Sequence, residues 1–108
     1  MLQAILGSQS AERILVYLYA RDEGFVREIA RFYETSMTPL LKQLDKLEKA
    51  GVLAGRDAGR TRLYSFDPRY PFLKELKALL KRALEFYPEE LREQLMMVRR
   101  RPRRKGKE

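Results

Sequence analysis

Residues 26–53 read VREIARFYETSMTPLLKQLDKLEKAGVL, and this stretch decides the fold that we predict for the chain. Apolar residues at helical spacing predict a short helix over about residues 26–33 and a longer one over about residues 37–50. Between them, residues 34–36 are Glu-Thr-Ser, which is long enough only for a tight turn. Two helices joined so closely form a helix-turn-helix pair.

The longer helix has one apolar side. Its leucines at positions 40, 44 and 47 form a narrow stripe that we expect to pack in the core. We expect Ser36 to cap the helix, Pro39 to fit in its first turn and Gly51 to end it. Lys42, Lys46 and Lys49 project from its other sides.

The segments around this pair complete the predicted order of elements. A first helix is expected over residues 8–21, capped by Ser8 or Ser10, with a short extended link at residues 25–26. After residue 51 the apolar period changes from 3.6 to 2, which predicts strands at 52–56 and 62–66. The turn between them contains Gly59, and the arginines of this hairpin are expected at its tip: Arg56, Arg60 and Arg62.

Two helices are predicted after the hairpin. Residues 71–87 carry an apolar stripe wider than one small core needs. A last helix follows Pro88 and is expected to end at Pro102. The predicted fold class is therefore mainly α with a small β-hairpin wing, an α+β winged helix with a three-helix core and one or two C-terminal helices. We divide the chain into a winged helix-turn-helix domain at 1–70, C-terminal helices at 71–98 and a basic tail at 99–108.

Charge and composition point to an anionic partner and away from catalysis. The 108 residues carry 23 Lys and Arg against 15 Asp and Glu, a formal charge of +8, and the tail at 99–108 supplies most of the excess. Without Cys or His there is no disulfide, no metal site of the usual ligands and no Ser–His or Cys–His pair. Asp45 and Glu48 alternate with lysines, a pattern typical of a salt-bridged helix surface. We expect no enzyme, no cofactor, no metal and no membrane span, and a cytoplasmic location.

The start of the helix at 37–50 has the chemistry that reads a DNA major groove. Hydroxyl side chains there can bond base edges or phosphates, apolar ones can touch a thymine methyl group, and lysines suit phosphates or guanine. The hairpin arginines would reach phosphates or the adjacent minor groove. The predicted DNA-binding residues are Ser36, Met37, Thr38, Leu41, Lys42, Lys46, Arg56, Arg60 and Arg62.

Three stretches also resemble a known family. ILGSQSAERIL, VREIARFYETSMTPLLKQLDKLEKAGVL and GRTRLYSFDP are similar to winged helix-turn-helix transcriptional regulators of the ArsR type, over roughly residues 5–70. The resemblance implies a winged-helix fold, a homodimer and a third helix that reads double-stranded DNA. Dimers of this family pack the first helix against helices that follow the wing. This implies a dimer interface at Leu73, Leu76, Leu80, Leu84 and Tyr87.

Two other functions stay open at this point. Phe32 and Leu41 are hydrophobic residues expected on the surface, which favours an adaptor whose third helix binds a protein. The basic tail alone would give a nonspecific nucleic-acid binder. The main hypothesis is a sequence-specific DNA-binding transcriptional regulator.

Overall fold

The computed structural model describes the backbone of residues 1–104 and the side chains of residues 1–96, so the side chains of the basic tail lie outside the described part. The elements occur in the order α1 (Gln3–Leu6), α2 (Gln9–Arg21), β1 (Glu23–Phe25), α3 (Val26–Tyr33), α4 (Thr38–Lys49), β2 (Leu53–Ala58), β3 (Thr61–Phe66), α5 (Leu73–Leu84) and α6 (Glu89–Arg104). The mainly helical architecture with one hairpin, predicted from the sequence, is confirmed. The four-residue helix α1 was not predicted.

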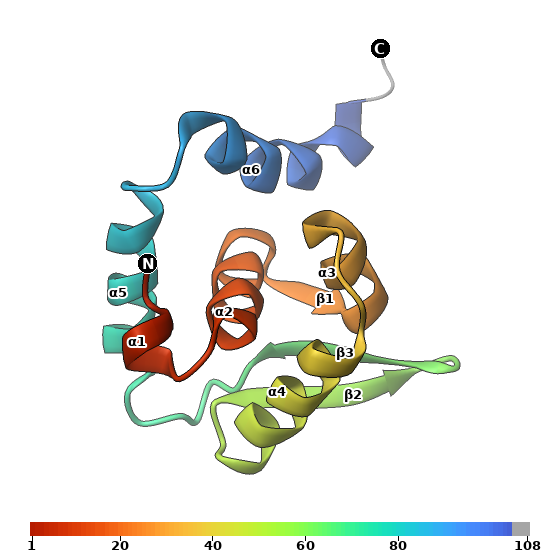
Figure 1. The fold of residues 1–108 in the computed structure, drawn as a ribbon. Coiled ribbons are helices and arrows are strands. Elements are labelled where there is room, and N and C mark those ends of the chain that lie inside the picture. The colour runs from red at the N-terminus through yellow and green to blue at the C-terminus, as the bar shows by residue number, and fades with distance from the viewer. Residues whose placement is uncertain (105–108) are drawn as a thin grey trace.

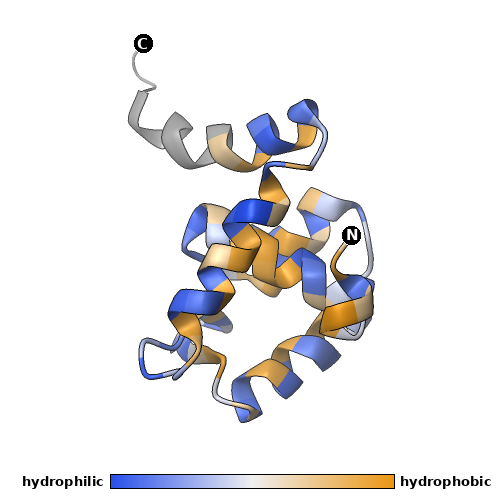
Figure 2. Cartoon of the chain, turned by 90° about the vertical axis from the view of Figure 1, so that its left-hand side faces the viewer, coloured by the Kyte–Doolittle hydropathy of each residue, from blue (hydrophilic) through white to orange (hydrophobic). Residues whose placement is uncertain are grey.

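Helix α2 lies at the centre of the molecule and packs against all five other helices and against β1 and β3 (Figure 1). Ser8 caps it, since the Ser8 hydroxyl oxygen accepts a hydrogen bond of 3.0 Å from the Ala11 N–H. Its residues Ile14, Val16 and Leu18 are fully buried. Hydrophobic residues gather where the helices meet and hydrophilic ones lie outside (Figure 2), so one core holds the chain together.

Helices α3 and α4 form the predicted helix-turn-helix pair. Glu34 adopts a left-handed backbone with φ 55° and ψ 50°, which reverses the chain between them. Leu40 and Leu44 are fully buried on the inner side of α4, as their spacing predicts. The prediction that Ser36 caps α4 is wrong, because the helix begins at Thr38 and Met37 occupies the capping position in a helical conformation. Ser36 therefore lies one residue too early to cap.

The three strands form an antiparallel sheet in the order β1-β3-β2. β3 pairs with β1 through Glu23↔Ser65 and with β2 through Leu53↔Phe66, so the short link before α3 is a real edge strand. The hairpin turn is shorter than predicted, because the strands extend to Ala58 and Thr61 and leave only two residues between them. Arg60 alone lies in this turn, and the expectation that Arg56 and Arg62 lie there is wrong.

The C-terminal helices enclose α2 from two sides (Figure 1). α5 is shorter than predicted, and α6 runs two residues past Pro102, which was expected to end it. Proline lacks the N–H that would bond the carbonyl four residues earlier, and its ring crowds that carbonyl, so it disfavours a long continuation of the helix; Pro102 falls in the last turn of α6. Within the described residues, no helix is both long and apolar enough to cross a membrane.

Candidate nucleic-acid interface

The first turn of α4 is exposed and carries no negative charge. Ser36, Met37 and Thr38 are all exposed, with 39% of Met37 accessible. No side chain caps the helix and its first turn contains no acidic residue. The uncapped N–H groups of a helix start carry partial positive charge and bind anions such as phosphate. This end of α4 is therefore open to an anionic partner.

Behind the first turn, the outer side of α4 is mainly cationic. Lys42 and Lys46 are exposed, and among the described side chains no carboxylate lies within 4.0 Å of either. Asp45 is paired with Lys49 at 3.1 Å, as the alternating charges predict. Between Thr38 and Phe66 the chain has six basic and three acidic residues, so this surface is net positive.

Arg62 is directed from the wing back to α4. Its Nη2 lies 2.5 Å from Glu48 Oε2, and its Nη1 lies 2.9 Å from Asp57 Oδ1. Its Nε donates a longer hydrogen bond of 3.4 Å to Glu48 Oε1, so two nitrogens contact one carboxylate. The hydrogen bonds to Glu48 and Asp57 raise the pKa of Arg62. Arg62 thus joins the wing, defined as β2, β3 and their turn, to α4.

Gly55 makes this arrangement possible. A Cβ atom at Gly55 would lie 2.6 Å from Arg62 Nε, closer than real side chains approach. A glycine inside a strand often marks such a close approach. Sequence reasoning missed both Gly55 and the partnership of Glu48 with Arg62. The available signal was the glycine itself, since it interrupts an otherwise regular strand pattern.

The remaining wing arginines are more exposed. Arg56 forms only a long ion pair of 3.8 Å with Glu23 on β1, and both side chains are more than half exposed. Such surface pairs hold side chains weakly. Arg60 is exposed in the turn, and no described carboxylate lies within 4.0 Å of it. The beginning of α4 and the hairpin turn lie toward the same side of the molecule (Figure 1).

Two apolar positions singled out in the sequence have different surroundings. Leu41 is 46% exposed on α4, as expected. Phe32 is half-buried, and its ring packs edge-on against the rings of Tyr17 and Tyr33. The ring centroids lie 5.7 Å and 4.8 Å from that of Phe32. The Arg21 guanidinium lies 5.0 Å from its ring centroid. The expectation that Phe32 is a surface residue is wrong, because the aromatic cluster covers it.

The predicted dimer residues lie mostly against the protomer's own core. Leu80 is fully buried and Leu84 is 9% exposed, while Leu73 and Leu76 are half-buried against the core. Tyr87 donates a hydrogen bond to the Glu12 carboxylate of α2. The exposed apolar side chains of this region are instead Phe72, Leu79 and Phe86.

Comparisons with solved structures place this geometry in a known fold. YusO from Bacillus subtilis superimposes with a TM-score of 0.57 and 21% identity over 89% of this chain and 74% of that one. ZitR from Lactococcus lactis, a C30AH42A mutant in apo form, superimposes with a TM-score of 0.55 and 19% identity over 90% of this chain and 82% of that one. The adhesin competence repressor AdcR from Streptococcus pyogenes superimposes with a TM-score of 0.53 and 18% identity over 90% of this chain and 81% of that one. The chain has the winged-helix fold.

At these identities the likeness concerns the winged-helix fold alone. No protein-family model and no curated protein sequence matches the chain. Among the described residues, no group of three His, Cys, Asp or Glu side chains is placed to hold a metal ion.

Proposed function

We propose that the protein is a sequence-specific transcriptional regulator that binds double-stranded DNA, of the ArsR type that its sequence resembles, acting in the cytoplasm. The observation that carries this proposal is the exposed, uncapped start of α4, with unpaired cations beside it on α4 and in the wing turn. In winged-helix recognition the second helix of the pair enters the major groove and the wing reaches the backbone or minor groove.

The residues have distinct proposed roles. Thr38 and Ser36 bond base edges or phosphates, and Met37 and Leu41 contact thymine methyl groups. Lys42, Lys46, Arg56 and Arg60 neutralise phosphates, which supplies most of the affinity. Arg62 contributes by holding the wing against Glu48, and its remaining exposed surface adds positive charge.

We infer that the working unit is a homodimer that uses one side of α5. Phe72, Leu79 and Phe86 recur every seven residues and are 62%, 37% and 63% exposed. Phe72 and Phe86 flank the two ends of α5, and Leu79 lies on the helix seven residues from each, which supports one apolar strip along α5 beside the half-buried Leu76. Such a dimer would carry two α4 helices, as recognition of two half-sites one helical turn apart requires.

The DNA interface can be mapped with the isotopically labelled full chain. In an NMR titration with random-sequence duplexes at about 0.15 M salt, we expect shifts at Thr38, Lys42 and Arg60. Shifts confined to residues 99–108 would instead indicate a nonspecific binder that uses its basic tail. An absence of shifts would contradict DNA binding altogether.

One observation favours a second function, a protein-binding adaptor. Met37 and Leu41 expose apolar surface side by side on α4, where a partner helix could pack. If the protein is an adaptor, Leu41→Asp abolishes capture of a specific cellular protein, and DNA binding is negligible at physiological salt. In the DNA-binding account the same substitution weakens DNA binding, because a carboxylate would face the phosphates.

A further inference from the structure

Arg62 contacts two carboxylates at once, one on α4 and one in the wing. Glu48 lies in the last turn of α4, and Asp57 of β2 is the residue directly opposite Arg62 in the hairpin register. One guanidinium and two ionised carboxylates sum to one negative charge. Such an excess is unfavourable on a surface that meets phosphates, and the contact that joins the wing to α4 requires only Glu48.

The two carboxylates occupy different edges of the guanidinium. Glu48 accepts hydrogen bonds from Nε and Nη2, at 3.4 and 2.5 Å, which form the side edge. Asp57 accepts from Nη1 alone, at 2.9 Å. The end edge, formed by Nη1 and Nη2, can donate to two oxygens of one phosphate group, because each terminal nitrogen has two hydrogens. Glu48 can therefore keep its contact while a phosphate replaces Asp57.

Asp57 is the easier of the two carboxylates to displace. Its side chain is 83% exposed, whereas that of Glu48 is 30% exposed. It accepts one hydrogen bond from Arg62 where Glu48 accepts two. An ion pair as exposed as that of Asp57 is screened by water and salt and is weak. Arg62 itself is partly exposed, so a phosphate can approach it.

We propose that Asp57 stands in for a DNA phosphate in the free protein, and that on binding a phosphate takes over the end edge of Arg62 while Glu48 keeps the guanidinium in place. Asp57 then lowers the affinity of the wing for every duplex, because its contact with Arg62 is broken before the phosphate binds. The inference rests on the proposed DNA-binding function and adds to it how a cation of the wing is held in the absence of DNA.

A cycle of variants tests this exchange, with the affinity of the full chain for a random-sequence duplex measured by fluorescence anisotropy at about 0.15 M salt. Asp57→Asn should raise the affinity about two- to fivefold, which is what one exposed ion pair supplies. In an Arg62→Gln background that gain should largely disappear, because the guanidinium that Asp57 occupies is absent. A gain of the same size in both backgrounds would indicate general repulsion of DNA by Asp57 and would overturn the proposal.

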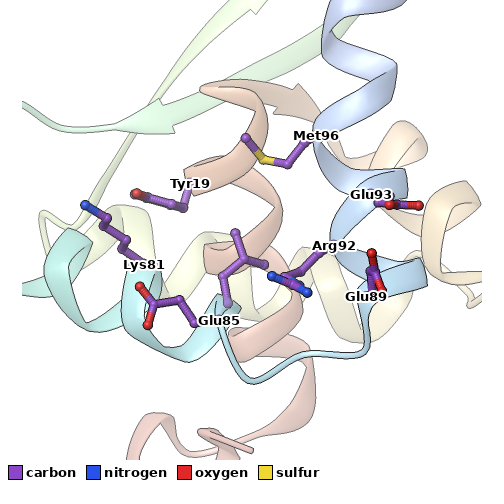
Figure 3. Close-up of a pocket in the computed structure, with 8 residues that line it drawn as sticks. Tyr19, Lys81, Glu85, Glu89, Arg92, Glu93 and Met96 are labelled. Carbon is purple, nitrogen blue, oxygen red and sulfur yellow. The ribbon is translucent and has the colours of Figure 1, made fainter.

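Glu85→Gln is the matched control. Glu85 forms an exposed pair with Arg82 at 3.3 Å, at the end of α5. It lies beside the groove between α5 and α6 (Figure 3), and α5 is on the other side of the molecule from the wing turn (Figure 1). The substitution removes the same charge as Asp57→Asn and should leave the affinity unchanged. A gain equal to that of Asp57→Asn would assign the effect to net charge and contradict the exchange.

Urea unfolding separates the exchange from a purely structural role of Asp57. If Asp57 only holds the wing in place, Asp57→Asn lowers both the free energy of unfolding and the DNA affinity. The proposal predicts a small loss of stability together with a gain of affinity, so a loss of affinity would overturn it. If the original chain binds no duplex, the proposed function fails and this inference fails with it. Binding by the original chain that Asp57→Asn leaves unchanged would overturn this inference alone.

Discussion

Arg62 of β3 and Glu48 of α4 form a two-point contact, with their closest atoms 2.5 Å apart, across the junction between the wing and the helix beside it. The contact gives the wing a fixed orientation relative to α4, because it joins the two elements through a planar guanidinium and a carboxylate. Both side chains are partly shielded from water, Arg62 at 39% and Glu48 at 30% exposure. The pair is therefore less screened than the more exposed ion pairs Asp45–Lys49 and Arg56–Glu23.

A double-mutant cycle tests this contact. Glu48→Gln and Arg62→Gln should each lower the free energy of unfolding, and the double variant should lose less than the sum of the two, because either substitution alone breaks the contact. Urea unfolding followed by circular dichroism gives the three values. The exposed pair Asp45–Lys49 is the control, for which we expect coupling near zero. Equal coupling in the two cycles would argue against a special role for Arg62.

Gly55→Ala should break the same contact from the other side. The added methyl group would lie 2.6 Å from Arg62 Nε and displace the flexible arginine, while the strand backbone of Gly55 accepts alanine without strain. We expect a modest loss of stability, after which Glu48→Gln has little further effect. The measurement is urea unfolding of both variants and their combination. If Glu48→Gln costs as much in the Gly55→Ala background as in the original chain, Arg62 has not moved.

Arg60 should contact phosphate through the wing turn. Replacing it with alanine should lower DNA affinity for all sequences and reduce the slope of log K against log salt by about 0.9. Fluorescence anisotropy at several salt concentrations measures the slope. Lys74→Ala, which removes an equal charge from α5, should leave the slope unchanged. An unchanged slope in Arg60→Ala would remove the turn from the interface.

Leu79→Lys should convert a dimer to a monomer without unfolding the protomer, because Leu79 is 37% exposed at the centre of the α5 strip. Ala78→Lys introduces the same charge at the neighbouring exposed position and should leave the dimer intact. Sedimentation equilibrium reports the mass of each variant. A monomeric original chain, or a dimer that persists in Leu79→Lys, would contradict the proposed interface.

Glu12 should make stability depend on acid pH. Burial raises the pKa of its carboxyl, but hydrogen bonds from Tyr87, the N-terminal ammonium and the Leu2 N–H lower it more, so the pKa lies below its ordinary value. A carboxylate with a lowered pKa stabilises the fold above its ordinary pKa, and this contribution is lost as the pH falls through the lowered value. The fold should therefore lose stability below about pH 4 to 5.

Glu12→Gln measures that contribution. It should cost about 1–3 kcal/mol at pH 7 and flatten the pH dependence between about pH 5 and 3, since charged hydrogen bonds are lost. Tyr87→Phe removes one donor to the same carboxylate and should show a smaller version of both effects. Asp45→Asn is the exposed control. A pH profile that is as steep in Glu12→Gln as in the original chain would assign the acid sensitivity to other carboxylates.

The elements of the fold could be predicted where local patterns decide them. The leucines of α4 fix its buried side by spacing alone, and Gly51, at φ 83°, ends the helix region as its type suggests. Ser36 could not be placed as reliably, because a helix cap depends on the starting residue, and here the helix begins one residue later than predicted. The four residues of α1 are too few for a periodic signal.

The sequence predicts which residue types form the candidate site, but it does not predict which side chains contact one another there. The exposure of Leu41 and Lys42 follows from the apolar stripe on the other side of α4. The contact between Arg62 and Glu48 joins residues 14 apart on different elements, which no local pattern encodes. The packing of α6 on α2, where Arg21 bonds the Leu95 carbonyl 74 residues away, likewise follows from no local pattern.

The central claim, that α4 and the wing read a DNA sequence, is tested most directly by selection from a pool of random duplexes at about 0.15 M salt. The full chain binds the pool, and the bound duplexes are amplified and sequenced over several rounds. The account predicts enrichment of an inverted repeat with half-sites about one helical turn apart, and loss of that enrichment in Thr38→Ala. Retention of duplexes without any enriched motif would contradict it.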